Sequence, residues 1–400
     1  MKRIALSFLL LSLLGVGCSK PTSDSIGTSR FGRLVGGSVT ESPIDGGWVR
    51  PHPGPFWWDQ IETSQDVYDW SKTDQTVKYW ESRNQAILAT LWPFAQWDQE
   101  RCHAKETKTK DPFGDQDVWL MSVCHVASYE EWIANVVERY DGDGVDDMPG
   151  LKYPITHWEI GNEPDLQTSD LSFFQYSPLA YEEIYRLAFD VIKQTDPNAV
   201  VLFGGMSSMS PSAQTYWKSI VENEKERAEV FNIHSIASSD QFFSKEYHEY
   251  LDALGFVNQP YWITEALVGS PIFERDEDLN AQMTMVGYVQ AFANGAQRIF
   301  NVGKQDPTGG PGEASEHTFN VVVKMIDGFE TVEWIGKESL IKFTFPDRDV
   351  YAAWDGVQLP LTVQGEVETI RFDGTKQKID ARKVKADVPT FVVVKTEQES

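Results

Sequence analysis

From residue 31 onward, short runs of apolar residues alternate with longer segments in which apolar positions recur at helical spacing. This alternation predicts parallel βα units, in which a helix follows each strand and packs on the sheet. Strands are predicted at residues 33–37, 48–52, 86–92, 156–161, 200–204, 230–234, 261–265 and 298–302. Helices are predicted at residues 74–83, 129–140, 179–193, 213–224, 245–254, 279–294 and 317–329.

The ends of the predicted helices carry local signals. Ser128 followed by Glu131 is a capping-box pattern, which predicts Ser128 as the N-cap of the helix at 129–140. Pro197 stops the helix at 179–193, because proline cannot continue a helix.

Eight strands with interleaved helices are typical of a (β/α)8 TIM barrel, an α/β fold. The alternative is a doubly wound open sheet, which usually carries a glycine-rich phosphate loop between its first strand and a helix. Here Gly36-Gly37-Ser38 leads into a loop rich in glycine and proline instead. Residues 31–335 are therefore expected to form the barrel.

The pattern changes after residue 335. Short strands with alternating polarity are predicted at residues 340–345, 350–354, 367–372, 377–380 and 390–395. Such strands, separated by turn residues, are typical of antiparallel sheets. Residues 336–400 are therefore expected to form a small, sandwich-like antiparallel β-domain that packs on the barrel.

The N-terminus does not belong to this pattern. Lys2 and Arg3 precede an apolar stretch at residues 4–14 that is too short to span a bilayer as a helix. Leu14-Gly15-Val16-Gly17-Cys18 then resembles a bacterial lipoprotein signal, with Gly15 where such signals usually have leucine. The resemblance implies a signal peptide at residues 1–17, lipidation of Cys18, a flexible tether at 18–30 and a lipid-anchored location in the bacterial cell envelope. Ordinary secretion or an uncleaved anchor is the alternative.

Composition restricts the partners. The chain has 400 residues, with 35 Lys and Arg against 60 Asp and Glu and a formal net charge of −25. This acidity argues against binding to nucleic acids and to anionic membrane surfaces, which attract Lys and Arg clusters. Membrane contact is expected through the lipid anchor only. The 14 Trp residues favour a ligand with apolar ring faces, such as a sugar, although most Trp side chains fill cores.

Two cysteines remain if Cys18 carries lipid. Cys102 and Cys124 flank one long loop, and in an oxidising compartment we expect them to form a disulfide. The bridge would restrain the loop and, in the chain-entropy model, raise the free energy of unfolding by about 3 kcal/mol. Two free thiols in a core are the alternative.

Candidate chemistry concentrates at the ends of two predicted strands. The fourth strand ends in Asn162-Glu163-Pro164, and the seventh ends in Glu265. The C-terminal ends of barrel strands meet at one face, so these two glutamates can converge although they are distant in sequence. Cleavage of a glycosidic bond needs such a pair, one protonated carboxyl group and one carboxylate.

These strand ends resemble those of the clan A glycoside hydrolases. By that resemblance Glu163 matches the acid/base, Glu265 the nucleophile and Asn162 the residue that hydrogen-bonds the sugar 2-hydroxyl. The segments Trp48-Val49-Arg50, 58–62 and 68–70 look similar to the second barrel unit of family 39. The resemblance implies substrate-binding roles for Asn162, Arg50 and His234, and His52 is a further candidate. Trp92, Trp97, Trp57 and Trp58 are candidates for the floor beneath the reacting sugar, with filling of the core as the alternative. The eighth strand lacks the Trp that many clan members place beneath the reacting sugar.

The resemblance implies a retaining glycoside hydrolase that cleaves a β-type bond in an oligosaccharide or polysaccharide by double displacement. The negative charge of Glu265 is expected to raise the pKa of Glu163, and Arg50 to keep Glu265 ionised. No cofactor is implied. The alternative is a non-catalytic carbohydrate-binding surface lipoprotein. The sugar, the choice of exo or endo action and the oligomeric state are left open.

An acidic loop at residues 141–147 offers a weak candidate for structural calcium. Asp141, Asp143 and Asp146 alternate with glycine and resemble the start of a calcium-binding loop, but Lys152 occupies the position of the bidentate glutamate in an EF-hand. A solvated acidic turn is the alternative interpretation.

Overall fold

A computed structural model describes residues 26–36, 44, 47–168, 171–236, 242–268, 276–302, 312–336 and 339–396. The predicted signal at 1–17, the lipidation site Cys18 and most of the predicted tether lie outside the described residues.

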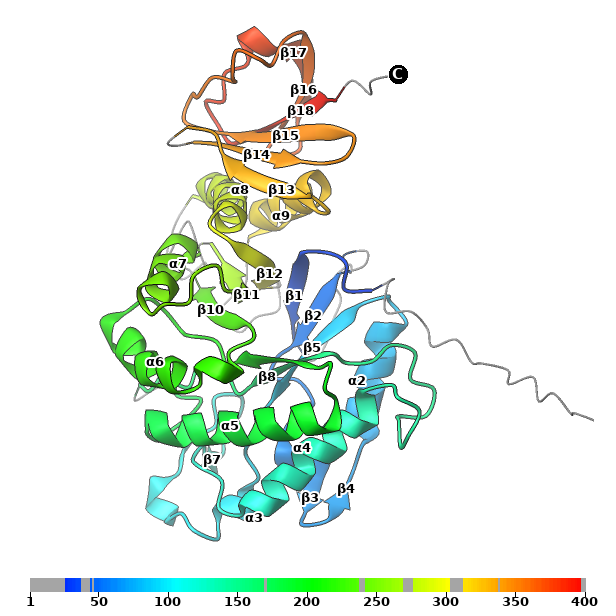
Figure 1. Ribbon diagram of the computed structural model, residues 1–400, viewed down its shortest axis with the longest axis vertical. Coiled ribbons are helices and arrows are strands. Elements are labelled where there is room, and N and C mark those ends of the chain that lie inside the picture. Colours follow the sequence, from blue (N-terminus) through cyan, green and yellow to red (C-terminus); the bar gives the residue numbers. More distant parts are fainter. Residues whose placement is uncertain are drawn as a thin grey trace, which may run out of the picture.

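Eight parallel strands form the central sheet (Figure 1). They are β1 (Phe31–Val35), β2 (Trp48–Pro51), β5 (Ala86–Leu91), β8 (His157–Ile160), β9 (Val200–Phe203), β10 (Phe231–Ile236), β11 (Tyr261–Leu267) and β12 (Ala296–Val302). Their order is β10-β11-β12-β1-β2-β5-β8-β9, and parallel bridges from Leu202 to Val230 and from Met206 to Ile233 join the two edges. The sheet thus closes on itself, which confirms the predicted barrel.

Seven long helices follow the strands and cover the sheet (Figure 1). They are α2 (Ser71–Glu81), α4 (Val126–Tyr140), α5 (Pro178–Thr195), α6 (Pro211–Asn223), α7 (Ser244–Ala253), α8 (Glu277–Ala293) and α9 (Glu313–Ile326). Ser177, Ser210 and Asp276 cap α5, α6 and α8 by accepting hydrogen bonds from backbone N–H groups. Within the described part of the chain, no helix combines the length and the apolar character needed to cross a membrane.

Shorter elements lie in the connections between the strands and long helices. They are α1 (Trp58–Ile61), β3 (Glu62–Ser64), β4 (Val67–Tyr68), α3 (Gln96–Gln99), β6 (Thr109–Lys110) and β7 (Asp117–Val118), with 3₁₀ turns η2 (Lys105–Thr107), η3 (Lys225–Arg227) and, in the C-terminal domain, η5 (Ala381–Lys383).

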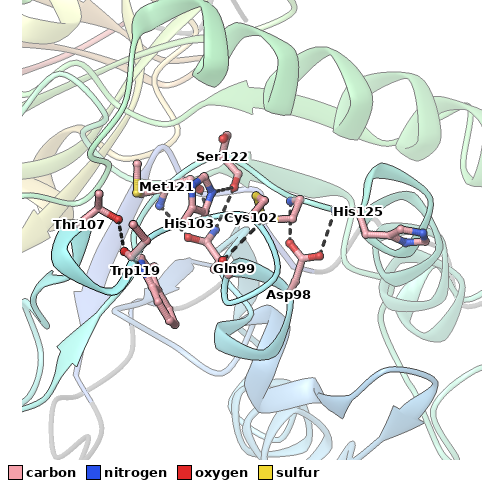
Figure 2. The surroundings of a disulfide bond; sticks show 11 residues. Asp98, Gln99, Cys102, His103, Thr107, Trp119, Met121, Ser122 and His125 are labelled. Carbon is pink, nitrogen blue, oxygen red and sulfur yellow. Dashed lines mark hydrogen bonds between the residues drawn. A yellow bond between two sulfur atoms is a disulfide. The ribbon is translucent and has the colours of Figure 1, made fainter.

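Helix α4 begins earlier than its sequence pattern predicts. Its N-cap is His125, whose Nδ1 accepts a hydrogen bond from the Ser128 N–H, so the prediction of Ser128 as N-cap is wrong. The reason is a tertiary contact. Asp98 accepts hydrogen bonds from the N–H groups of Cys124 and His125, at 2.8 and 3.0 Å, and orients the chain just before the helix (Figure 2).

The long loop between β5 and α4 is closed at its base. Cys102 and Cys124 form the predicted disulfide (Figure 2). Beside it, the Gln99 side chain donates to the Met121 carbonyl at 2.8 Å and accepts from the Met121 N–H at 3.0 Å. These contacts tie together the two ends of the segment that carries the β6–β7 hairpin.

The C-terminal domain is the predicted antiparallel β-domain. Its strands are β13 (Thr331–Trp334), β14 (Leu340–Thr344), β15 (Arg348–Ala353), β16 (Glu366–Arg371), β17 (Lys376–Asp380) and β18 (Thr390–Lys395), hydrogen-bonded in the order β13-β14-β15-β18-β16-β17. The sequence pattern does not predict β13. The sheet lies against α8 and α9 (Figure 1), where Thr318 Oγ1 donates to the Phe372 carbonyl and Phe329 packs on Phe343.

His157 marks the N-terminal end of the barrel, opposite the ends of the strands that carry the predicted site. Its ring packs between Trp48 and Trp262, with centroid distances of 4.8 and 5.0 Å. Burial, reinforced by the charge of Arg298, lowers the pKa of His157 to about 3. The barrel therefore holds this ring neutral well below the pH at which a free histidine gains a proton.

His157→Gln is expected to remove part of the acid sensitivity of the fold. The unfolded chain protonates His157 near its ordinary pKa of 6.5, whereas the folded chain does so only near 3. Below pH 6.5 the wild type therefore loses about 1.4 kcal/mol of unfolding free energy per pH unit at this residue, and the variant does not. Urea unfolding of both proteins at several pH values measures the difference, and parallel pH dependences would contradict it.

Candidate active site

Buried polar and charged side chains meet at the C-terminal ends of the barrel strands. Arg50 lies on β2, Asn162 and Glu163 follow β8, His234 lies on β10 and Glu265 on β11. None of the five residues is more than 7% exposed. The closed barrel brings them together because the ends of parallel strands share one face.

The guanidinium of Arg50 donates hydrogen bonds to the side-chain oxygens of three residues. Its Nη1 donates to Glu265 Oε1 at 2.7 Å, its Nη2 to Asn162 Oδ1 at 2.6 Å, and its Nε to Glu159 Oε2 at 2.7 Å. Burial opposes the charge of Arg50, but the carboxylates of Glu159 and Glu265 outweigh burial and raise its pKa. Arg50 is therefore a permanent positive charge that favours an ionised Glu265 and fixes the position of its oxygen.

Glu163 lies in a turn with a strained backbone. Its φ is 39°, in the left-handed region that costs a residue with a side chain about 1–2 kcal/mol. Contacts with the end of β9 hold the turn. The Glu163 N–H donates to the Gly204 carbonyl at 2.7 Å, and the nearby Asp165 carboxylate accepts from Ser207 Oγ at 2.6 Å and from Trp217 Nε1 at 2.9 Å.

Two glycines at the end of β9 leave room for this arrangement. A Cβ at Gly204 would collide with the carbonyl oxygen of Ile160. A Cβ at Gly205 would collide with the His234 ring, and Gly205 has a φ of 52°, a conformation that other residues rarely adopt. The approach of the Glu163 turn and the His234 ring to the strand end therefore requires glycine at both positions.

His234 connects the two glutamates. Its Nδ1 lies 2.8 Å from Glu163 Oε1 and 3.6 Å from Glu265 Oε1, and its Nε2 lies 2.9 Å from Thr264 Oγ1. Burial lowers the pKa of His234, while the charge of Glu265 partly opposes the shift. Oxygens of Glu163 and Glu265 and a His234 ring nitrogen all lie within 4.8 Å of one another. The two carboxyl groups are close but unequal, since Arg50 faces Glu265 and a neutral ring faces Glu163.

A third carboxylate, Glu159 on β8, lies fully buried beneath this pair. Its Oε2 accepts from Arg50 and from Thr90 Oγ1, and its Oε1 accepts from Asn232 and lies 3.1 Å from Thr264 Oγ1. Sequence reasoning missed Glu159, Thr90, Asn232 and Thr264. The signal that finds them is a polar residue inside an otherwise apolar barrel strand, because a buried polar group requires a partner.

Trp58 does not offer a ring face to a ligand, contrary to the sequence expectation. The side chain is fully buried, its Nε1 donates to Glu62 Oε2 at 2.7 Å, and its ring stacks on Trp132 of α4. Trp97 joins the same cluster, since its ring packs against Trp58 and its Nε1 donates to the Glu62 carbonyl. The reason is that α1 turns its aromatic side toward α4 rather than toward Glu163 and Glu265.

Trp92 lies behind His52 with its ring faces covered. It is fully buried, stacks on Trp57 at 4.7 Å and donates from Nε1 to the Pro53 carbonyl. His52 itself reaches the cluster, with its Nδ1 3.3 Å from Arg50 Nη1 and 3.9 Å from Glu265 Oε1. Burial, and then the charge of Arg50, lower the pKa of His52 well below its ordinary value.

Phe113 is an exposed aromatic residue whose ring lies close to His52. It lies between β6 and β7 and is 37% exposed. Its ring centroid lies 5.2 Å from His52, 5.5 Å from Trp92 and 5.7 Å from Phe173. Sequence reasoning missed Phe113. An aromatic residue in a turn between two paired cysteines is a pattern that could have indicated it as a candidate site residue.

The acidic loop after α4 differs from the predicted calcium candidate. Oxygens of Asp141, Asp143 and Asp147 lie within 4.8 Å of one another, whereas Asp146 is not in this group and has a left-handed φ of 45° within the turn. Asp147 accepts hydrogen bonds from two backbone N–H groups of the same loop. Burial raises the pKa of Asp141 to about 6. Calcium binding by this loop stays a prediction.

Glu163, His234 and Glu265 are also close enough to hold a cation between them. The Arg50 guanidinium, however, lies 2.7 Å from Glu265 and already supplies a positive charge there. Repulsion from Arg50 disfavours a divalent cation at this position.

No protein-family model and no curated protein matches the chain in sequence. Solved structures do match its fold. A family 39 glycoside hydrolase from Bacteroides cellulosilyticus WH2 has a TM-score of 0.59 at 12% identity, over 93% of this chain and 82% of that one. A family 39 β-xylosidase from Caulobacter crescentus has a TM-score of 0.58 at 14% identity, over 94% and 98%. A glucosidase from Croceicoccus marinus has a TM-score of 0.55 at 15% identity, over 88% and 90%.

The chain has the fold of these glycoside hydrolases. This confirms the fold that the strand-end motifs implied. At such low identity the likeness concerns the fold, and the activity has to be argued from the site.

Paired substitutions at Glu163 measure the backbone strain of the turn. Glu163→Gly relieves the φ of 39°, whereas Glu163→Ala removes the same carboxyl group and keeps the strain. The glycine variant is therefore expected to be more stable by about 1 kcal/mol. Chemical unfolding measures both variants. The same pair at exposed Glu226, in the helical turn η3, serves as control and should show the opposite order. Equal stability at position 163 would contradict the strain.

Proposed function

We propose that this protein is a retaining glycoside hydrolase that cleaves a β-type glycosidic bond in an oligosaccharide or polysaccharide. The observation that carries the proposal is the pair Glu163 and Glu265, whose oxygens lie within 4.8 Å in a buried site. Retaining enzymes hold their carboxyl groups about 5–5.5 Å apart, whereas inverting enzymes need about 6.5–9.5 Å to admit a water molecule. The short separation favours double displacement.

The unequal surroundings of the two glutamates assign their roles. Glu265, held as a carboxylate by Arg50, attacks the anomeric carbon while the bond to the leaving oxygen breaks. Glu163 gives that oxygen its proton, and a glycosyl ester of Glu265 forms. Glu163 then takes a proton from water, the water oxygen attacks the anomeric carbon, and Glu265 leaves as a carboxylate.

Asn162 is proposed to bind the sugar beside the nucleophile. Its Oδ1 accepts from Arg50 Nη2 at 2.6 Å, which turns its NH₂ group away from the guanidinium. That orientation suits donation to a sugar hydroxyl near the anomeric carbon. The alternative of a non-catalytic binding protein has no use for two carboxyl groups held this close, because their mutual repulsion costs stability.

We also propose that the mature chain is exported and anchored to the bacterial cell envelope through Cys18. The leader sequence carries this proposal. The Cys102–Cys124 disulfide supports it, since structural disulfides persist in oxidising compartments outside the cytosol.

Substitution of the two glutamates tests the mechanism on a panel of aryl β-glycosides. Glu265→Ala and Glu163→Ala are each expected to lower kcat/KM at least about 1,000-fold on a substrate with a poor leaving group. On a substrate with a good leaving group, which departs without a proton from Glu163, azide should restore turnover in both variants, giving an inverted glycosyl azide with Glu265→Ala and a retained one with Glu163→Ala. Exposed Glu226→Ala is the control and should keep wild-type kinetics. Full activity of Glu265→Ala on the best substrate would contradict the proposal.

Phe113→Ala tests whether the β6–β7 hairpin forms part of the substrate site. Loss of the exposed ring beside His52 should raise KM roughly 2- to 10-fold with little change in kcat, because stacking on an aromatic ring contributes binding but no chemistry. Phe113→Tyr keeps a ring and should keep KM. Leu361→Ala, which removes another exposed apolar side chain, serves as the surface control. Unchanged KM for Phe113→Ala would place the hairpin outside the substrate site.

A further inference from the structure

Asn232 has a fixed side-chain orientation. Its Nδ2 donates to Glu159 Oε1 and to the Phe203 carbonyl, which lies 3.3 Å away. A flipped amide would point its oxygen at two acceptors, the Phe203 carbonyl and the Glu159 carboxyl group that pairs with Arg50. Asn232 Oδ1 therefore faces Thr264 Oγ1, at 2.8 Å, and needs a hydrogen from it.

Thr264 has one hydrogen and three polar neighbours. Its Oγ1 lies 2.8 Å from Asn232 Oδ1, 3.1 Å from Glu159 Oε1 and 2.9 Å from His234 Nε2. The two oxygens are obligate acceptors, whereas the histidine nitrogen can be either donor or acceptor. The Thr264 hydrogen therefore goes to an oxygen, and its own oxygen accepts a hydrogen from His234 Nε2.

His234 is thereby left with an unprotonated Nδ1. The ring is fully buried, and burial lowers its pKa, so it is neutral and carries one hydrogen only. The Nδ1 lone pair points at Glu163 Oε1 from 2.8 Å. Two acceptors at this distance repel each other unless one bears a hydrogen, and that hydrogen then belongs to the carboxyl group of Glu163.

We propose that Thr264 is a positioning residue that fixes His234 in its Nε2-protonated tautomer and so makes Glu163 hold the acid proton in the resting site. The inference deepens the proposed function, because it explains how the acid arrives protonated at the first step. The hydrogen-bond chain runs from Arg50 through Glu159 and Asn232 to Thr264, and it ends at His234. Of these groups, Arg50 and His234 also lie close to Glu265, at 2.7 and 3.6 Å.

Other charged and titratable groups also bear on His234. They come from the neighbouring elements and are Glu163 and Glu159 at β8, Asp165 in the turn after β8, Arg50 and His52 at β2, and Glu265 on β11. Arg50 carries one positive charge, which balances one of the carboxylates Glu159 and Glu265 but not both. A neutral Glu163 avoids adding one more negative charge to this buried cluster, which would be costly.

The tautomer can be read directly in the wild-type protein. Nitrogen-15 NMR of protein labelled at histidine distinguishes a protonated from an unprotonated ring nitrogen, and loss of one signal set in His234→Asn assigns the residue. We expect a protonated Nε2 and an unprotonated Nδ1 at neutral pH. A protonated Nδ1, alone or in a doubly protonated ring, would overturn the proposal, and this readout needs neither a substrate nor a folded Thr264 variant.

The kinetic consequence is tested with Thr264→Val and Thr264→Ser. Valine removes the acceptor for Nε2, so His234 can donate from Nδ1 and favour an ionised Glu163. The alkaline limb of kcat/KM on an aryl glycoside should move about one pH unit toward lower pH, while serine should keep the wild-type profile. An unmoved limb in a folded valine variant would contradict the role of Thr264. Absence of any glycosidase activity in the wild type would instead contradict the proposed function and leave the NMR result to decide the tautomer.

Discussion

The buried guanidinium of Arg50 is the interaction on which the candidate site depends. A charge inside a barrel is costly unless its donors are all matched, and Arg50 meets acceptors on Glu159, Asn162 and Glu265. Its planar fork fixes the relative positions of strand ends from three parts of the sheet. It also makes two carboxyl groups electrostatically unequal, because it touches Glu265 and leaves Glu163 to a neutral histidine. The proposed acid and nucleophile roles rest on that difference.

The backbone at the strand ends positions the charged side chains of the site. Glu163 has a left-handed φ, Gly205 makes room for the His234 ring, and the β10–β11 pairing shifts register between Ile233 and His234. Such irregularities concentrate where a side chain must be aimed, since a regular strand points its residues only inward or outward. The regular part of each strand closes the barrel, and the last residues position the chemistry.

The alternating pattern predicted each of the eight barrel strands and the long helices well, because strand and helix periods are local properties of sequence. It failed where a distant residue intervened. Asp98 starts α4 at Val126 despite the capping box at Ser128, and the packing of α1 on α4 buries the ring of Trp58. The sequence pattern did not identify Thr264 and Asn232 as site residues for the same reason, because their hydrogen-bond partners lie on other strands.

The sequence by itself determined the barrel, the C-terminal β-domain, the disulfide and the placement of Glu163 and Glu265 at strand ends, because periodicity, cysteine count and strand order need no coordinates. Only the tertiary structure decided that Glu159 shares Arg50 with Glu265, which carboxyl group meets His234, and which aromatic ring beside His52 is exposed. These contacts join residues that are far apart in the chain. Because the site is buried, each polar contact is stronger than it would be in water, and each unpaired polar group would be more costly.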